Sequence, residues 1–218
     1  MTRLVALGGN MIQCIIFDCD GTLVDSEYLC NLGLEIKLKE YGVNKSAYEM
    51  MEKFRGGKLT TILESLEEQH KIKLTEDFIR SYRALVESLF EDQLQPCEGV
   101  AEMLAEISLP KCVASSGPHN KINKALNFTG LSGYFKGNIF SSYEVRSWKP
   151  DPGIFLHAAR VMGYSTQNCV VVEDSLVGIA AAQRVEMKAI LYDPTGIHPH
   201  INGVHKIQHM SELSGVIT

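Results

Sequence analysis

The sequence predicts an α/β protein, with a doubly wound parallel sheet and a helical domain inserted after the first strand. Short apolar segments rich in β-branched residues alternate with amphipathic segments along most of the chain. Strands with little polar alternation, separated by helices, are typical of a parallel sheet that is buried on both faces. One interval, from about residue 27 to residue 95, has helical character throughout. This interruption of the alternating pattern indicates an insertion.

Five segments are predicted to form the strands of the sheet. They are IIF (15–17), CVASS (112–116), NIFSS (138–142), CVVVED (169–174) and KAILY (188–192). Their lengths and β-branched content are those of strands, and the amphipathic segments beside them have the period of helices. These helices are expected near 100–107, 119–127, 153–162 and 176–184. Helices on both faces of one sheet are the simplest packing for this order of elements.

The predicted domain boundaries lie at the two ends of the helical insertion. Residues 12–26 and 96–218 would form the α/β core, and residues 27–95 would form a helical cap. We assign no function to the tail of residues 1–11. An insertion that leaves the sheet directly after its first strand is expected to act as a lid, which excludes water and selects the substrate.

Composition and charge restrict the classes of function. The 218 residues carry a net charge of −5, and 45% of them are hydrophobic, which is typical of a soluble globular protein and argues against broad nucleic-acid binding. No apolar run has the length of a membrane-spanning helix, so no membrane association is expected. The six cysteines show neither a CxxC pair nor zinc-ligand spacing. That pattern favours a reducing compartment, and we expect a cytoplasmic protein.

Polar residues follow three of the predicted strands where each strand ends. They are Asp18 with Asp20, Ser115 with Ser116, and Glu173 with Asp174. Ligands of open α/β sheets bind at this edge. Two carboxylates placed two residues apart on a strand point to the same side and repel each other unless a proton or a cation neutralises them. Mg²⁺ prefers such oxygen ligands. The sequence therefore predicts a site for a metal ion and an anion at this edge.

Four motifs in order resemble those of the haloacid dehalogenase superfamily of phosphohydrolases. They are FDCDGTLVDSE, CVASSG, SWKPDPGIF and VVVEDSLVGIAAA, and the resemblance covers nearly the whole chain from Ile12. It implies a Rossmann-like core with an inserted cap of the α-helical type. One position departs from the pattern, because Glu186 stands near a place that is usually glycine.

The resemblance implies a role for each residue of these motifs. Asp18 would be the nucleophile that forms an aspartyl-phosphate, and Asp20 would be the general acid and base. Lys149 would balance the charge. The implied metal ligands for Mg²⁺, with Mn²⁺ as the alternative ion, are Asp18, Asp20, Glu173 and Asp174. The implied phosphate-binding residues are Gly21, Thr22, Ser115, Ser116 and Lys149. Ser116 is also expected to cap the helix that follows it.

Within the superfamily, the residues favour simple hydrolysis of a phosphate monoester. Dehalogenases lack the second acid that is present here as Asp20, and Cys30 stands where phosphoglucomutases of the β type have a histidine. No cap lysine is singled out as the Schiff-base residue of a phosphonoacetaldehyde hydrolase. A mutase of the β-phosphoglucomutase type and a non-catalytic phosphate-binding or interaction protein remain the alternatives.

The segments DCDGTLVDSE, KFRGGKL, SSGPHNK and WKPDP together resemble the 6-phosphogluconate phosphatase branch more closely. In that case Arg55 and Lys58, from the cap segment FRGGKL, would bind the substrate, and Arg55 would grip a carboxylate with two hydrogen bonds. Asn120 and Lys121, at the end of SSGPHNK, are further candidates to face the pocket. The expected substrate is a small sugar phosphate or a related organic phosphate. The expected partner is thus a small phosphorylated metabolite, bound by a monomer or a weak oligomer.

Overall fold

The computed structural model describes residues 11–54 and 57–217 of the chain. Two compact units are present: the first runs to Val24 and resumes at Pro96, and the second is Asp25–Gln95. The role of the second unit as a cap stays a prediction. Residues 1–10, 55–56 and 218 lie outside the described residues, and Arg55, which is predicted to bind the substrate, is one of them.

The first unit contains a six-stranded parallel sheet in the order β3-β2-β1-β4-β5-β6, so the predicted doubly wound fold is confirmed. β1 is a central strand, with β2 and β4 as its neighbours. The chain moves outward from β1 to one edge and then returns to add β4, so the switch point of the fold lies beside β1. The strands are β1 (Cys14–Phe17), β2 (Lys111–Ser115), β3 (Ile139–Ser141), β4 (Cys169–Glu173), β5 (Lys188–Tyr192) and β6 (His205–Ile207).

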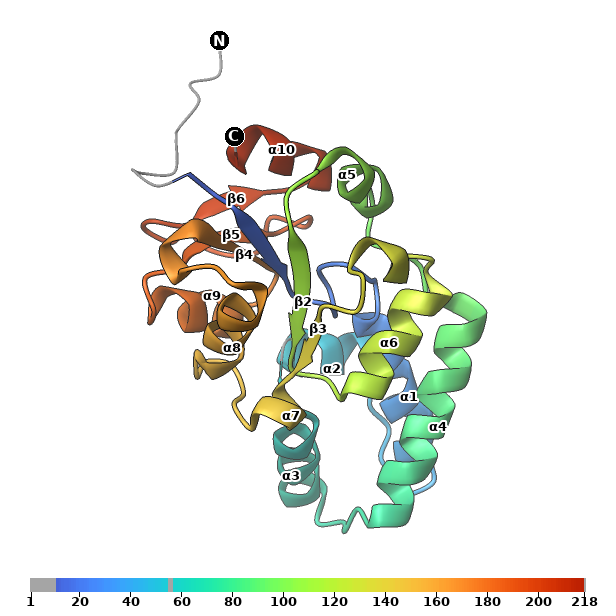
Figure 1. Cartoon of the computed structure of the whole chain (residues 1–218). Helices are drawn as coiled ribbons and strands as arrows, with labels where there is room; N and C mark the ends of the chain where they lie inside the picture. The colour runs from blue at the N-terminus through green and yellow to red at the C-terminus, as the bar shows by residue number, and fades with distance from the viewer. Residues whose placement is uncertain (1–10, 55–56, 218) are drawn as a thin grey trace. The chain divides into compact units, whose positions relative to one another are not determined.

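Helices cover both faces of this sheet (Figure 1). On one face, α8 and α9 pack on alternate residues of the strands, among them Ile16, Ala114 and Val171, which are completely or almost completely buried. α5 and α10 pack together with the 3-10 turn Met210–Glu212 on the other face. The helices of this unit are α5 (Val100–Glu106), α6 (His119–Phe128), α7 (Ser142–Val145), α8 (Gly153–Met162), α9 (Leu176–Gln183) and α10 (Leu213–Ile217).

The sixth strand, β6, is not among the strands predicted from the sequence. It has only three residues, HKI, and of these only Ile207 is fully buried. A short strand at the edge of a sheet needs no apolar run, because one of its sides is open. Its pairing with β5 is decided by the tertiary fold.

The second unit is built from four helices among its described residues, and the predicted insertion contains no described strand. They are α1 (Glu27–Lys39), α2 (Ala47–Phe54), α3 (Leu59–His70) and α4 (Glu76–Gln93). α1 and α4 pack closely, and a Cβ atom on Gly33 would lie 2.6 Å from Cγ2 of Val86. Thr75 caps the start of α4, because its side chain accepts a hydrogen bond from the Phe78 N–H.

Glu186 shows why glycine is usual at its position. Its φ angle is +52°, in the left-handed region, where a side chain is strained by contact with its own backbone. The turn that leads from α9 into β5 therefore has the left-handed geometry that suits glycine, although glutamate stands there. No helix in the described part of the chain is long and apolar enough to cross a membrane.

Candidate active site

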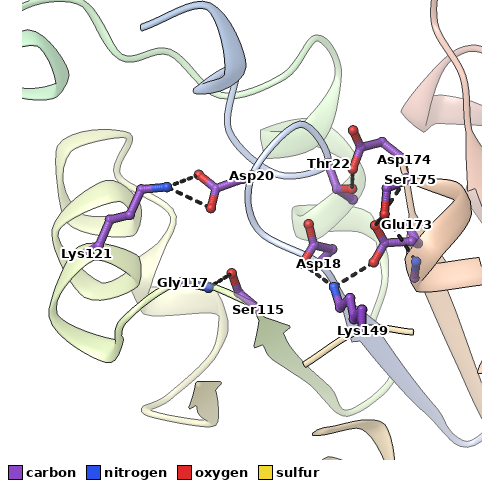
Figure 2. Close-up of polar contacts among 11 residues, drawn as sticks. Asp18, Asp20, Thr22, Ser115, Gly117, Lys121, Lys149, Glu173, Asp174 and Ser175 are labelled. Carbon is purple, nitrogen blue, oxygen red and sulfur yellow. Dashed lines mark hydrogen bonds and ion pairs between the residues drawn. The ribbon is translucent and has the colours of Figure 1, made fainter. Parts of the chain in front are cut away.

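The carboxyl ends of the central strands bring the predicted site residues together, as Figure 2 shows. Asp18 follows β1, Ser115 ends β2, and Glu173 ends β4 with Asp174 directly after it. Because β1 lies between β2 and β4, these ends are adjacent at the switch point. The four side chains are buried. The loop that contains Asp20 and Thr22 follows Asp18 at the same edge.

Lys149 links two of the buried carboxylates. Its Nζ atom donates to Oδ1 of Asp18 at 2.5 Å and to Oε2 of Glu173 at 2.6 Å. The exposed fractions of these side chains are 4% for Lys149, 10% for Asp18 and 1% for Glu173. Charge-assisted hydrogen bonds of this kind are strong, and they fix the ammonium between the two acids.

The electrostatics of Asp18 are dominated by its surroundings. Burial and the neighbouring Glu173 carboxylate raise the pKa of Asp18 to about 7, although Lys149 acts in the opposite direction. Burial alone would lower the pKa of Lys149, but the carboxylates of Asp18 and Glu173 outweigh it and raise that pKa above the ordinary value. Lys149 is thus protonated at neutral pH, and one ammonium is too little positive charge for the acids around it.

Asp174 is held by the loop that follows β1. Oγ1 of Thr22, which is fully buried, donates to Oδ1 of Asp174 at 3.2 Å. Gly21 has a φ of +77°, and a Cβ atom there would lie 2.4 Å from Oδ2 of Asp174. Glycine is therefore needed at this position for its backbone angle and also for the close approach of the carboxylate. Gly21 and Thr22 orient Asp174, which adds to the phosphate-binding role predicted for them.

Three of the four predicted metal ligands form one cluster. Carboxylate oxygens of Asp18, Glu173 and Asp174 all lie within 4.8 Å of one another, and all three residues are buried. Such a group of hard oxygen donors fits Mg²⁺ or Mn²⁺. The charge of the cluster also favours a divalent cation, because Lys149 alone does not neutralise the three acids.

The side chain of Asp20 is outside this cluster. Its two carboxylate oxygens accept hydrogen bonds from Nζ of Lys121 at 2.8 and 2.9 Å, and Figure 2 shows Asp20 turned toward α6. The sequence-based expectation that Asp18 and Asp20 belong to one strand is wrong, because β1 ends at Phe17 and Asp20 lies in the loop that follows. The family resemblance implies a metal contact for Asp20 through its backbone carbonyl, and this stays a prediction.

The loop after β2 is closed by two hydrogen bonds. The Gly117 N–H donates to Oγ of Ser115 at 3.1 Å, and Oγ of Ser141 donates to the Gly117 carbonyl at 2.6 Å. Ser141, which ends β3 and is fully buried, was not predicted as a site residue, although it too is a polar residue at a strand end. The capping role expected for Ser116 is wrong, because α6 begins at His119 with Pro118 as its capping residue.

Glu173 is fixed by the start of α9. The backbone N–H and the hydroxyl of Ser175 donate to Oε1 of Glu173 at 3.1 and 2.6 Å. The same hydroxyl caps α9 by accepting from the Gly178 N–H at 3.2 Å. Ser175 is a second site residue that the sequence-based prediction missed. The signal was present, because a serine directly before a helical pattern is a common cap.

Gly178 is required by the position of Glu173, and Gly178→Ala tests this. A Cβ atom on Gly178 would lie 2.1 Å from the carboxylate carbon of Glu173, which is held on both oxygens. We expect Glu173 to be displaced, with kcat reduced about 10-fold and stability reduced by about 1–3 kcal/mol. Activity and thermal unfolding measure the two effects. The control is Gly215→Ala, where a Cβ atom would have no neighbour within 4 Å; equal effects of both variants would contradict the assignment.

The two residues predicted to contact the substrate belong to the second unit. Arg55 lies outside the described residues, and Lys58 is the half-buried residue that precedes α3. Their contribution to a substrate site stays a prediction.

Comparisons with known proteins find similar sequences over most of the chain. A sequence model described as a haloacid dehalogenase-like hydrolase matches residues 12–186. The 6-phosphogluconate phosphatase of Escherichia coli (strain K12) is 33% identical over 210 residues, which are 94% of this chain and 95% of that protein.

Two solved structures extend the comparison. A haloacid dehalogenase-like protein of unknown function from Agrobacterium tumefaciens str. C58 has a TM-score of 0.80 at 32% identity, with 94% of this chain and 97% of that chain covered. A hydrolase from Deinococcus radiodurans R1, solved with bound phosphate and sodium, has a TM-score of 0.74 at 25% identity, with 93% of each chain covered.

Proposed function

This chain belongs to the haloacid dehalogenase-like hydrolase family and is a phosphatase of that family; we propose that it hydrolyses a small sugar phosphate, with Mg²⁺, through a phosphorylated Asp18. The observation that carries the proposal is the arrangement around Asp18. A buried carboxylate lies against a protonated lysine and beside two further acids. That is the inventory needed for phosphoryl transfer, which depends on positioning and on charge stabilisation.

In the first step, Asp18 attacks the phosphorus atom of the substrate. Lys149 binds Oδ1 of Asp18, so Oδ2 is the oxygen that would form the new bond. The bond from phosphorus to the sugar oxygen breaks, and Asp20, protonated at the start of this step, gives its proton to that oxygen as the sugar leaves. Asp20 then becomes the carboxylate that accepts from Lys121. Lys149 remains close enough to stabilise the negative charge that develops on the transferred group.

In the second step, water attacks the phosphorus atom of the aspartyl-phosphate. Asp20, now ionised, takes a proton from this water. The bond from phosphorus to Oδ2 breaks, so inorganic phosphate leaves and Asp18 returns as a carboxylate. The loop between Ser115 and Gly117, fixed by Ser141, would hold the phosphate oxygens during both steps.

The metal ion would be held by Asp18, Glu173 and Asp174, with the Asp20 carbonyl as a further ligand. When bound, Mg²⁺ supplies positive charge that lowers the repulsion between these acids and the anionic substrate. Thr22 and Ser175 keep Asp174 and Glu173 in orientation through the hydrogen bonds described above.

The substrate class is proposed from the relatives. The similar Escherichia coli protein is named a 6-phosphogluconate phosphatase, and Arg55 and Lys58 of the second unit offer positive charges for a carboxylate. We propose 6-phosphogluconate, or a sugar phosphate like it, as the substrate. Phosphate bound in the Deinococcus radiodurans hydrolase supports an anion-binding role for this fold.

Removal of divalent cations tests the proposed function. We expect hydrolysis of p-nitrophenyl phosphate and of 6-phosphogluconate with Mg²⁺, and a loss of about 100-fold or more with EDTA, because the buried acids are then left without their counter-ion. Addition of excess Mg²⁺ should restore the rate. Activity that is unchanged in EDTA would contradict the metal site. Absence of turnover on a panel of sugar phosphates with Mg²⁺ would contradict the substrate class.

A further inference from the structure

We propose that Lys121 is a positioning residue, which fixes the carboxylate of Asp20 for acid–base catalysis; this inference rests on the proposed function. Lys121 lies in the first turn of α6, whereas Asp20 lies in the turn after β1, 101 residues earlier. None of the four motifs contains Lys121. Figure 2 shows the pair beside the cluster of Asp18, Lys149 and Glu173, with the ammonium facing both oxygens of Asp20.

The geometry of this pair limits the side chain of Asp20. Nζ of Lys121 lies 2.8 Å from one carboxylate oxygen and 2.9 Å from the other. A contact to both oxygens fixes the rotation of the carboxylate as well as its position. The backbone is fixed separately, because Asp20 pairs with Val24 and the Gly21 N–H donates to the Val24 carbonyl at 2.9 Å. Lys121 adds a constraint on the side-chain torsions of Asp20.

Lys121 is itself placed by the loop that would bind phosphate. α6 follows directly after the segment in which Ser115 and Ser141 hold Gly117. A Cβ atom on Gly117 would lie 3.7 Å from Oδ2 of Asp20 and 3.5 Å from Oγ of Ser115. The carboxylate of Asp20 therefore lies against this loop. Because α6 continues from this loop, a movement of the loop would also move Lys121. The Asp20 carboxylate would then keep its position relative to the proposed phosphate site.

The accessibility of the pair separates it from the buried pairs of Lys149. The exposed fractions are 30% for the Lys121 side chain and 24% for that of Asp20, whereas Lys149 is 4% exposed. An accessible ion pair contributes little to stability, because water screens it. Loss of the ammonium should therefore change the reaction rate more than it changes folding. Misplacement of a catalytic group by about 1 Å can reduce rates strongly.

The test compares Lys121→Met with Lys121→Arg. We expect kcat of the Met variant to fall about 10-fold on 6-phosphogluconate with KM unchanged, because the proposed role of Lys121 is to hold Asp20 and not to bind the substrate. Arginine can grip a carboxylate with two hydrogen bonds, so Lys121→Arg should return kcat to within about 3-fold of wild type. Lys136→Met, which removes an exposed positive charge from the same unit, is the matched control.

A comparison of kcat/KM on substrates with different leaving groups separates this role from a merely structural one. p-Nitrophenolate leaves with little need for a proton, whereas a sugar alkoxide needs one. The fall in kcat/KM for Lys121→Met should therefore be larger for the sugar phosphate than for p-nitrophenyl phosphate. Lys121→Gln is a second variant with the same expectation, and thermal unfolding verifies that both fold.

Two results would overturn the inference. One is a kcat equal to or above that of wild type in both Lys121→Met and Lys121→Gln. The other is a rise in KM with kcat unchanged, which would make Lys121 a substrate contact. If either result is obtained while the wild-type protein turns over substrate and this turnover depends on Asp18, the proposed function still stands. Failure of the proposed function itself would appear as wild-type protein without turnover, or as full activity after Asp18 is replaced.

Discussion

Replacement of Asp18 by asparagine is expected to abolish turnover, with kcat reduced about 1,000-fold or more. An amide oxygen is a far weaker nucleophile than a carboxylate, although the two side chains have nearly the same volume. The measurement is the hydrolysis of p-nitrophenyl phosphate with Mg²⁺, together with acid quenching of the wild type on a radiolabelled substrate. Label should remain on wild-type protein and be absent from Asp18→Asn.

The matched control for this experiment is Asp92→Asn. Asp92 is an exposed aspartate of α4 in the second unit, so its replacement changes the net charge equally at a residue with no proposed role. Asp18→Ala serves as a second variant, because it has no side-chain amide that could revert to the acid. Activity of both Asp18 variants within about 10-fold of wild type would show that another residue receives the phosphoryl group.

Replacement of Lys149 by methionine is expected to have the second largest effect, on stability as well as on rate. The methionine side chain would leave the buried carboxylates of Asp18 and Glu173 facing each other without their shared ammonium. Breaking a buried ion pair on one side costs about 3 kcal/mol, which for a chain of this size lowers Tm by about 6–12 °C. Thermal unfolding without Mg²⁺ measures this effect, and kcat should fall about 1,000-fold because charge stabilisation is lost.

A double-mutant cycle separates the charge effect from lost packing. Glu173→Gln removes one of the two repelling acids, so Lys149→Met combined with Glu173→Gln should recover part of the lost stability. Lys136→Met, at an exposed site, should leave Tm unchanged. A Tm for Lys149→Met equal to wild type would mean that the ammonium does not neutralise these acids. Additive losses in the double variant would mean that the two side chains act independently.

Much of the fold follows from local patterns. The five segments predicted as strands all occur as strands, because each is a run of β-branched or apolar residues that must be buried on both faces of a parallel sheet. β6 was missed because its three residues contain a single fully buried side chain, Ile207. The helix boundaries were predicted closely where a proline or glycine marks the helix start, as at α8, which begins at Gly153.

The candidate site was predictable to a smaller degree. The motifs supplied Asp18, Lys149, Glu173 and Asp174, and the structure brings these four side chains to one edge of the sheet. The sequence pointed to Lys121 as a residue that could face the pocket, but its pairing with Asp20 could not be predicted, because the two residues are 101 positions apart and meet only in the folded chain. The place of Ser141 at a strand end was a signal, but its role could not be predicted, since it acts through the Gly117 carbonyl, a backbone atom 24 residues away.

The sequence alone determined the order of the five predicted strands and of the four helices predicted beside them, the inserted helical segment and the identity of the acids. Residue types and their spacing are local properties, and a carboxylate that directly follows a buried strand is fixed at the edge of a parallel sheet. Only the tertiary structure decided that Lys149 lies between Asp18 and Glu173 and that Lys121 holds Asp20. The reason is physical: side chains from distant segments meet only when packing brings their backbones together, and the crowding of charge then decides which groups pair.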